Sequence, residues 1–182
     1  MTAFATATAL PLRSADRANP FELGPLARAA VGVVGVGFTT VCALAAVRFA
    51  AGLAPDHAGT QSFAVMLHIA TVVPAVPLGA WLMLSRKGTP RHKQLGKLWV
   101  ALMVITALAA LFIRQINGGG FSPIHLFVPL TLHGAWKTIA TARRGDIAAH
   151  KKALIGFYLG ALTIPGLFAF MPGRVMGTWL FG

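Results

Sequence analysis

Four histidines recur in this chain at two nearly equal spacings, and imidazole is a common ligand of transition metals. His68 and His92 are 24 residues apart, and His125 and His150 are 25 residues apart. Each pair brackets Gly-Ala-Trp and then two basic residues followed by glycine, in the same order. The repeated order predicts that the four histidines form one set with a shared role.

The chemistry that suits such a set is the binding of two b-type hemes, each held by two imidazoles from facing helices. We expect His68 and His125 to form an outer pair of metal ligands, and His92 and His150 to form an inner pair. A helix N-terminus disfavours imidazolium and keeps a histidine there neutral and able to coordinate. The cations expected to bind the heme propionates include Arg86, Arg91, Arg114 and Arg144, with Arg48 as a further outer candidate.

A structural role for these histidines is an open alternative. His92 and His150 lie among cations at the expected membrane surface, where they could contact lipid phosphate or cap a neighbouring helix. His68 could hydrogen-bond between helices. His133 competes with His125 as the outer ligand of its helix, and we favour His125 because its position in the repeat is equivalent to that of His68.

The composition is that of an integral membrane protein. Of 182 residues, 56% are hydrophobic and 11% are charged, and the mean hydropathy is +0.71. These values are too apolar for an ordinary soluble domain. The net charge of +12 does not indicate a nucleic-acid binder, because most cations lie between hydrophobic runs and not along one solvated face. The lipid bilayer is the expected partner.

Five apolar runs approach the roughly 20 residues that a transmembrane helix needs. They cover about residues 29–52, 62–84, 90–113, 123–142 and 147–171. Segments 86–97 and 137–152 hold ten of the sixteen Lys and Arg residues, which places both in the cytoplasm. We predict a bacterial inner-membrane protein with a cytoplasmic N-terminus and an external C-terminus. Residues 1–25 form a flexible tail and residues 26–182 a single membrane domain.

The second and third runs resemble the fourth and fifth, which indicates an internal duplication. Each copy contains two spans, so both copies insert in the same orientation as parallel repeats. The predicted fold is an all-α integral membrane protein with five transmembrane helices, in which helices 2 to 5 form a four-helix bundle from two helix-pair repeats. Thr89, Ser122 and Asp146 are the expected N-caps of the third, fourth and fifth helices.

A stand-alone enzyme is not indicated. The chain has four acidic residues, none of them within an apolar run, and no motif of a known catalytic class. The predicted function is transmembrane electron transfer by a bis-histidine diheme protein, with quinone or a larger membrane complex as candidate partners. The alternative is a cofactor-free accessory or assembly subunit of a respiratory or photosynthetic complex, packed through glycine faces at 32–37 and 156–160.

Several segments resemble a known family. They include "RKGTPRHKQLGKLWV", "FSPIHLF", "RRGDIAAHKKALIG" and "GLFAFMPGRVMGTWLFG". From His68 onward the chain resembles the bacterial predicted membrane protein family catalogued as domain of unknown function twenty-three-oh-six, which implies a helical membrane domain and no established activity. The placement of histidines on helices 2 and 4, and on 3 and 5, is similar in architecture to the transmembrane ascorbate-reducible diheme cytochromes b. Those proteins hold their histidines deeper in the bilayer than His92.

Overall fold

The computed structural model describes residues 23–182, which are mainly helical and contain no β-strand. Three long helices come first: α1 (Pro25–Ala50), α2 (Phe63–Leu84) and α3 (Pro90–Ala110). A short 3-10 helix, η1 (Ala58–Gln61), lies between α1 and α2. After α3 the chain passes through two further 3-10 turns into the next long helix: η2 (Gln115–Asn117), η3 (Pro123–Leu126) and α4 (Phe127–Arg143).

A single helical rod follows α4. It consists of α5 (Ile147–Gly156), the π-helix η4 (Phe157–Thr163) and α6 (Ile164–Phe168). Pro165 lies at the start of α6, and proline removes one backbone donor and clashes with the carbonyl four residues earlier. This accounts for the wider helical turn before it, and such π segments are frequent at functional sites. A last short helix, α7 (Val175–Phe181), follows a turn.

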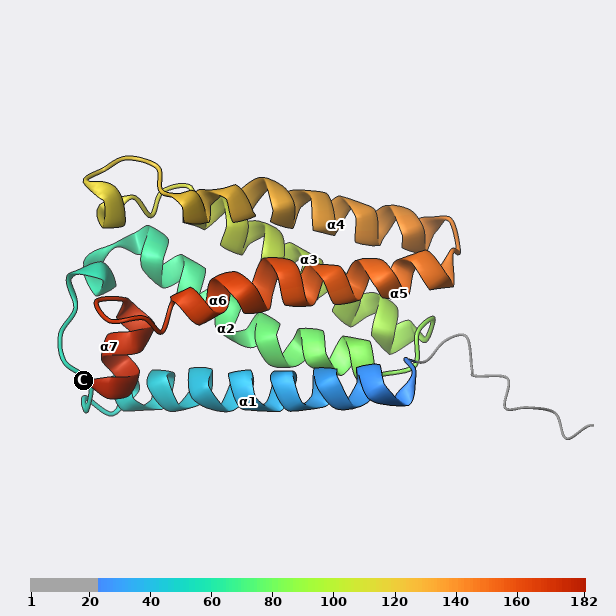
Figure 1. Ribbon diagram of the computed structural model, residues 1–182, viewed down its shortest axis with the longest axis horizontal. Helices are drawn as coiled ribbons and strands as arrows, with labels where there is room; N and C mark the ends of the chain where they lie inside the picture. Colours follow the sequence, from blue (N-terminus) through green and yellow to red (C-terminus); the bar gives the residue numbers. More distant parts are fainter. Residues whose placement is uncertain (1–22) are drawn as a thin grey trace, which may run out of the picture.

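Helices α2, α3, α4 and the α5–α6 rod pack around one another, with α1 along one side (Figure 1). α2 contacts α3, α3 contacts α4, α4 contacts α5 and η4, and η4 contacts α2. α2 and α4 therefore stand opposite each other, as do α3 and the rod. α1 packs against α2 and α7. Ligands from opposite helices would meet in the centre of this arrangement.

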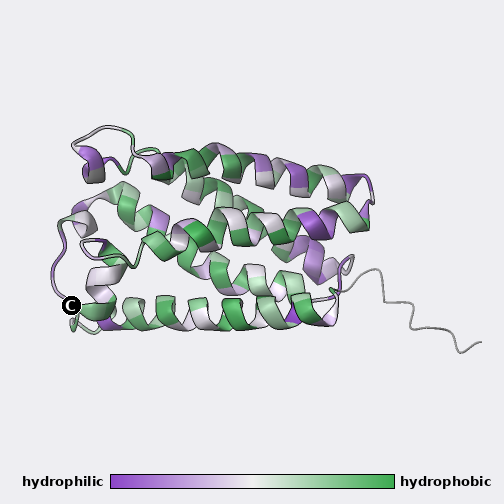
Figure 2. Ribbon diagram, viewed as in Figure 1, coloured by the Kyte–Doolittle hydropathy of each residue, from purple (hydrophilic) through white to green (hydrophobic). Residues whose placement is uncertain are grey.

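The two ends of the helix assembly carry different segments (Figure 1). One end, here called the basic end, contains the start of α1 and the loops 85–89 and 144–146. Each of these two loops turns at a glycine with positive φ, Gly88 at 87° and Gly145 at 70°, a conformation that favours glycine. The other end, here called the C-terminal end, contains α7, η1 and η2. Hydrophilic residues gather toward both ends, and the helices between them are mostly hydrophobic (Figure 2).

The helix surfaces are suited to lipid. α1, α2 and α3 are long and apolar enough to cross a membrane. Large apolar side chains are exposed on the helices of the described chain, among them Leu26, Val33, Leu130 and Trp136. Hydrocarbon accommodates such a surface, whereas water does not. α4 and α5 are shorter, with 17 and 10 residues. The 3-10 helix η3 directly precedes α4, and the π-helix η4 directly follows α5.

Two of the three predicted N-caps are present as predicted, and the third, Ser122, caps η3 instead of α4. Thr89 Oγ1 accepts a hydrogen bond from the N–H of His92 at 3.1 Å, and Asp146 Oδ1 accepts one from the N–H of Ala149 at 2.9 Å. Ser122 forms a capping box at the start of η3, one turn before α4 begins. These caps fix where α3 and α5 start and therefore place the histidines of their first turns.

Two glycines allow close approach of helices in the core. A Cβ on Gly79 would lie 2.7 Å from Trp99 Nε1 and 2.7 Å from a ring carbon of Tyr158. A Cβ on Gly134 would lie 2.8 Å from the ring of Phe157. These glycines are the first residues of the two Gly-Ala-Trp segments, so each segment packs against an aromatic ring of a neighbouring helix.

The five predicted apolar runs correspond, with shifted ends, to five helical rods. These are α1, α2, α3, η3 with α4, and α5 with η4 and α6. α1 begins at Pro25, before the predicted 29, and α3 ends at Ala110, before the predicted 113. α7 lies beyond the predicted spans, and its Trp179 is buried against Phe49, with ring centroids 4.1 Å apart. Most of the predicted tail, residues 1–22, lies outside the described residues.

Candidate functional site

The structure brings two of the predicted histidines together at the basic end. His92 lies in the first turn of α3 and His150 in the first turn of α5. Both side chains are buried, with 7% and 8% of their surface exposed. Their ring centroids are 6.2 Å apart and the ring planes are inclined at 79°. The predicted inner pair is thus an observed pair of neighbouring rings.

Each of these two rings is held through its Nδ1 atom. His92 Nδ1 lies 3.3 Å from Ser85 Oγ, and His150 Nδ1 lies 3.1 Å from the carbonyl oxygen of Thr138 and 3.5 Å from Thr141 Oγ1. Ser85 is the C-cap of α2 and Thr141 lies in the last turn of α4, so in both cases a hydroxyl near the end of one helix contacts the histidine in the first turn of the next. The Nε2 atoms of His92 and His150 make no hydrogen bond within the described residues.

The spacing of the His92 and His150 rings suits two ligands on opposite sides of one metal ion. Metal–nitrogen bonds to histidine are about 2 Å long. Two imidazoles on opposite sides of one ion would have ring centroids about 6 Å apart, and the His92 and His150 centroids are 6.2 Å apart.

Basic side chains surround the pair. Lys87 is only 3% exposed, and its Nζ donates a hydrogen bond to the carbonyl oxygen of Met83. Arg86 and Arg91 line a surface hollow of about 410 Å³ together with Ser85, the residue that contacts His92. Arg144 is exposed at the next loop. Of the predicted cations, Arg86 and Arg91 therefore share a hollow with the residue that contacts His92.

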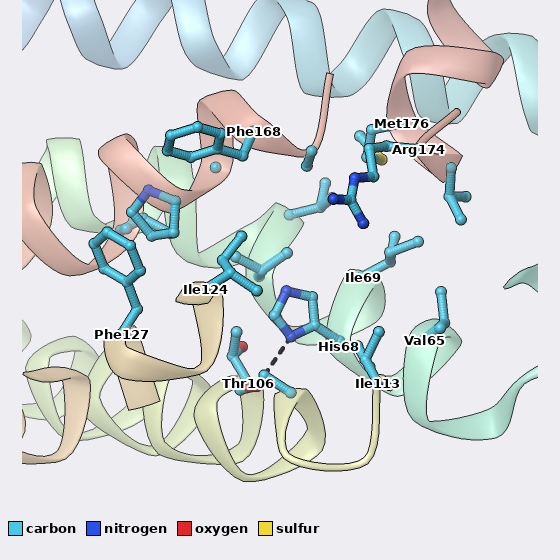
Figure 3. A pocket seen from close by; sticks show the side chains of 18 of the residues that line it. Val65, His68, Ile69, Thr106, Ile113, Ile124, Phe127, Phe168, Arg174 and Met176 are labelled. Atoms are coloured by element: carbon cyan, nitrogen blue, oxygen red, sulfur yellow. Dashed lines mark hydrogen bonds between the residues drawn. The ribbon is translucent and has the colours of Figure 1, made fainter. Parts of the chain in front are cut away.

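At the C-terminal end, His68 and His125 line one common cavity of about 340 Å³ (Figure 3). Its wall is mainly aliphatic, as Val65, Ile69 and Ile113 illustrate. A cavity of this size and polarity is typical of a binding site for a small organic molecule. The predicted outer pair thus shares a space, whereas the inner pair shares a ring contact.

His68 projects from α2 and is oriented by α3. Its Nδ1 lies 3.0 Å from the carbonyl oxygen of Thr106, as the dashed line in Figure 3 marks. Thr106 Oγ1 donates to Thr71 Oγ1 at 2.8 Å, which joins the two helices beside the histidine. The contact fixes the ring of His68 and leaves its Nε2 atom for another partner.

His125 is 9% exposed and lies in η3, directly before α4. The backbone N–H of Ser122 donates to His125 Nδ1 at 3.0 Å, and the carbonyl oxygen of Ser122 lies 3.1 Å from the same atom. The tautomer decides which of these contacts is used. His125 Nε2 is buried and has no hydrogen-bond partner, which is unusual for a buried polar atom.

The two other histidines of the described chain differ from this set of four. His57 uses both ring nitrogens, since Nδ1 accepts from the N–H of Gly59 at 2.9 Å and Nε2 lies 3.3 Å from the carbonyl oxygen of Gly173. His133 is exposed beside Trp136, with ring centroids 5.7 Å apart. His125 lines the cavity and His133 does not. Of the two histidines predicted to compete for the outer site, only His125 therefore shares the cavity with His68.

Two arginines expected near the outer pair lie elsewhere. Arg114 places its guanidinium carbon 4.4 Å from the ring centroid of Phe121 and does not line the cavity. Arg48 donates to the carbonyl oxygens of Trp179, at 2.9 Å, and Gly182, at 2.6 Å. Arg48 therefore anchors α7 to α1.

Arg174, which was not among the predicted site residues, lines the cavity at the C-terminal end. Figure 3 shows its guanidinium extending toward the ring of His68. The residue lies between the last rod and α7, outside the predicted spans and outside the repeat. The available signal was a single cation in the otherwise apolar segment "FMPGRVMG".

Of the comparisons with known proteins, one identifies a family. A family model described as "Predicted membrane protein (DUF2306)" matches residues 65–179, which is more than half of the chain and includes all four histidines. No curated protein and no solved structure matches the chain, so these comparisons give no support to the similarity with diheme cytochromes b. Within residues 23–182, no group of three or more His, Cys, Asp or Glu residues is arranged to hold a metal ion. The chain belongs to the DUF2306 family of predicted membrane proteins.

Proposed function

We propose that this protein holds two b-type hemes among four of its five membrane-spanning helices and carries electrons across the bilayer. The observation that supports this best is the common hydrogen bonding of four buried or half-buried histidines. In His68, His92 and His150 the Nδ1 atom lies between 3.0 and 3.3 Å from a carbonyl or hydroxyl oxygen. His125 Nδ1 lies 3.1 Å from the carbonyl oxygen of Ser122 and 3.0 Å from its backbone nitrogen, so His125 has the same pattern in its Nδ1–H tautomer. Metal-bound histidines usually donate their other ring N–H to such an oxygen, which directs Nε2 to the metal.

The helix arrangement supports the same pairing. His68 and His125 come from opposite helices of the packed set, and so do His92 and His150. Lengths support five spans: besides α1, α2 and α3, η3 with α4, and α5 with η4 and α6, would each extend about 30 Å at 1.5 Å per residue. The basic end lies in the cytoplasm, since its loops carry the clustered Lys and Arg residues.

The repeated contacts support a duplication of the helix pair. The Gly-Ala-Trp glycines each pack on an aromatic ring, and a hydroxyl residue before each basic loop contacts the next histidine. Parallel repeats of this kind carry equivalent ligands at equivalent depths. Two cofactors, one near each membrane face, fit this internal symmetry.

Heme would supply the one-electron chemistry, and the protein residues would hold and insulate it. The Nε2 atoms of His92 and His150 would bind the iron at the basic end, and those of His68 and His125 the iron at the C-terminal end. Trp99 and Phe157, with ring centroids 4.9 Å apart, fill the core along the helices from the basic-end pair and exclude water. Quinone or a larger membrane complex would exchange electrons with the protein.

The direct test is a reduced-minus-oxidised absorption spectrum of the purified full-length protein, expressed with added heme precursor. We expect the bands of low-spin bis-histidine heme b and about two hemes per chain. A pyridine hemochrome assay would give the stoichiometry. Protein that is folded and monodisperse but contains no heme would rule the proposal out.

A cofactor-free accessory subunit is the second candidate, and one observation favours it. A Cβ added at Gly32 or Gly37 of α1 would meet no atom within 4 Å, so this helix presents small residues to its surroundings, as helix–helix interfaces in membranes do. Affinity purification after gentle extraction would test it. A stable partner lost on Gly32→Leu, with no heme present, would favour this reading over the first.

A further inference from the structure

The cavity at the C-terminal end contains a cation without a partner. The guanidinium of Arg174 makes no hydrogen bond or ion pair within the described chain, and no Asp or Glu lines this cavity. Arg174 is half-buried, and an unpaired charge in largely apolar surroundings is costly unless an anion neutralises it. This charge therefore indicates an anionic group on the molecule that fills the cavity.

A second polar atom, in a side chain that lines this cavity, also lacks a partner. His125 Nε2 is buried and makes no hydrogen bond, although the side chain belongs to the cavity lining. Most of the remaining wall is aliphatic, for example Val65, Ile69 and Val72. The wall thus combines a large apolar area with one guanidinium, which fits an apolar molecule that carries an acidic group.

We infer that Arg174 binds the carboxylate of an amphipathic ligand whose apolar body fills this cavity. The guanidinium offers a planar pair of N–H donors that match a carboxylate. The identity of the ligand as heme rests on the proposed function, in which the carboxylate is a propionate. A free fatty acid presents the same chemistry.

The position of Arg174 is fixed from both sides. His57 Nε2 lies 3.3 Å from the carbonyl oxygen of Gly173, the preceding residue. The N–H of Thr178 bonds to the carbonyl oxygen of Arg174 at 2.8 Å. The backbone is therefore held on the cavity wall, and the side chain extends toward His68 (Figure 3). Such a preset cation selects an acid over its neutral ester.

The test compares acid and ester forms of the same ligand. Heme and its dimethyl ester are titrated into full-length His150→Ala protein in nanodiscs, where binding at the basic end is removed. In this background we expect the acid to bind about tenfold more tightly than the ester, and we expect Arg174→Leu to abolish the difference. Arg174→Lys should retain part of it, because the charge remains. Arg114→Leu, at a cation outside the cavity, should retain all of it.

A second probe separates this inference from the heme proposal. If neither form of heme binds, the proposed function fails, and spin-labelled stearate is compared with its methyl ester in wild-type and Arg174→Leu protein. A preference for the acid that disappears in Arg174→Leu supports the role of Arg174 for a fatty acid. An absent preference, or one unchanged in Arg174→Leu, overturns the inference with either probe. If Arg174→Leu fails to fold, judged by gel filtration, Arg174→Gln and Arg174→Lys replace it.

Discussion

The two histidine pairs share a sequence pattern, but they lie in very different surroundings. At the basic end, His92 and His150 are neighbouring rings with centroids 6.2 Å apart. At the C-terminal end, His68 and His125 line a cavity of about 340 Å³, and His125 Nε2 has no partner. Similar sequence spacing is thus found once with two neighbouring rings, here called the closed site, and once with two rings that line a cavity, here called the open site.

The difference comes from the connections before each histidine. His92 and His150 follow short basic loops with a glycine turn and a capped helix start, so both rings are placed by tight local geometry. His125 follows the long segment 111–122, and His68 lies inside α2, after the helix has already begun. The spacing of the histidines in the sequence is therefore similar in the two halves, whereas their packing depends on the segments that precede them.

Removing a ligand from each site should have the largest effect. We expect His150→Ala to lower the heme content from about two per chain to about one, and His125→Ala to remove the other heme, because each iron loses one axial ligand. The double variant should contain none. Pyridine hemochrome assays on purified variants measure this, and a heme content unchanged by both substitutions would contradict the pairing.

The second-largest effect is expected from overpacking the core around Gly79, which should lower the stability of the protein. Gly79→Ala would place a methyl group 2.7 Å from Trp99 and Tyr158, which should cost about 1–3 kcal/mol of unfolding free energy. Gly96→Ala, where an added Cβ meets nothing within 4 Å, is the matched control and should not destabilise. Thermal unfolding in detergent compares the two variants, and equal midpoints would show that the core near Gly79 adapts easily.

Removing the hydroxyl groups that contact His92 and His150 should affect the two histidines to different extents. Ser85→Ala removes the oxygen 3.3 Å from His92 Nδ1, and we expect heme affinity at the basic end to fall about tenfold. Thr141→Val should have a smaller effect, because His150 keeps the Thr138 carbonyl at 3.1 Å. Heme transfer to apomyoglobin measures both, and a larger effect of Thr141→Val would show that the hydroxyl orients His150.

The smallest effect is expected at the competing histidine. His133 is exposed and lies outside the cavity, so His133→Ala should leave heme content and spectrum unchanged. His125→Ala in the same preparation is the positive comparison. Loss of one heme in His133→Ala alone would reassign the outer ligand.

Local signals in the sequence predicted much of the structure. Thr89 and Asp146 are caps as expected, and the rods follow the apolar runs, because capping chemistry and hydrophobicity act over a few residues. The meeting of His92 and His150 also agrees with the prediction, since equal spacing after matching loops sets equal depth. Whether these residues hold heme stays a prediction.

The features that the sequence did not indicate depend on long-range packing. α7 is too short and mixed to stand out, and it is held by Arg48 from a helix more than a hundred residues away. Arg174 has no equivalent in the repeat, so its place in the cavity depends on how the last rod turns back. Lys87 is buried and the adjacent Arg86 is exposed, and the sequence gives no sign of which of these two neighbouring cations is the buried one.

The glycine turns at Gly88 and Gly145 have a consequence for the order of assembly. Each closes a helical hairpin, α2 with α3 and α4 with the last rod, which can enter the bilayer as a unit while the chain is being made. Each histidine pair takes one residue from each hairpin. Neither site can form on the first hairpin alone, so occupancy of either one would report that both hairpins have docked.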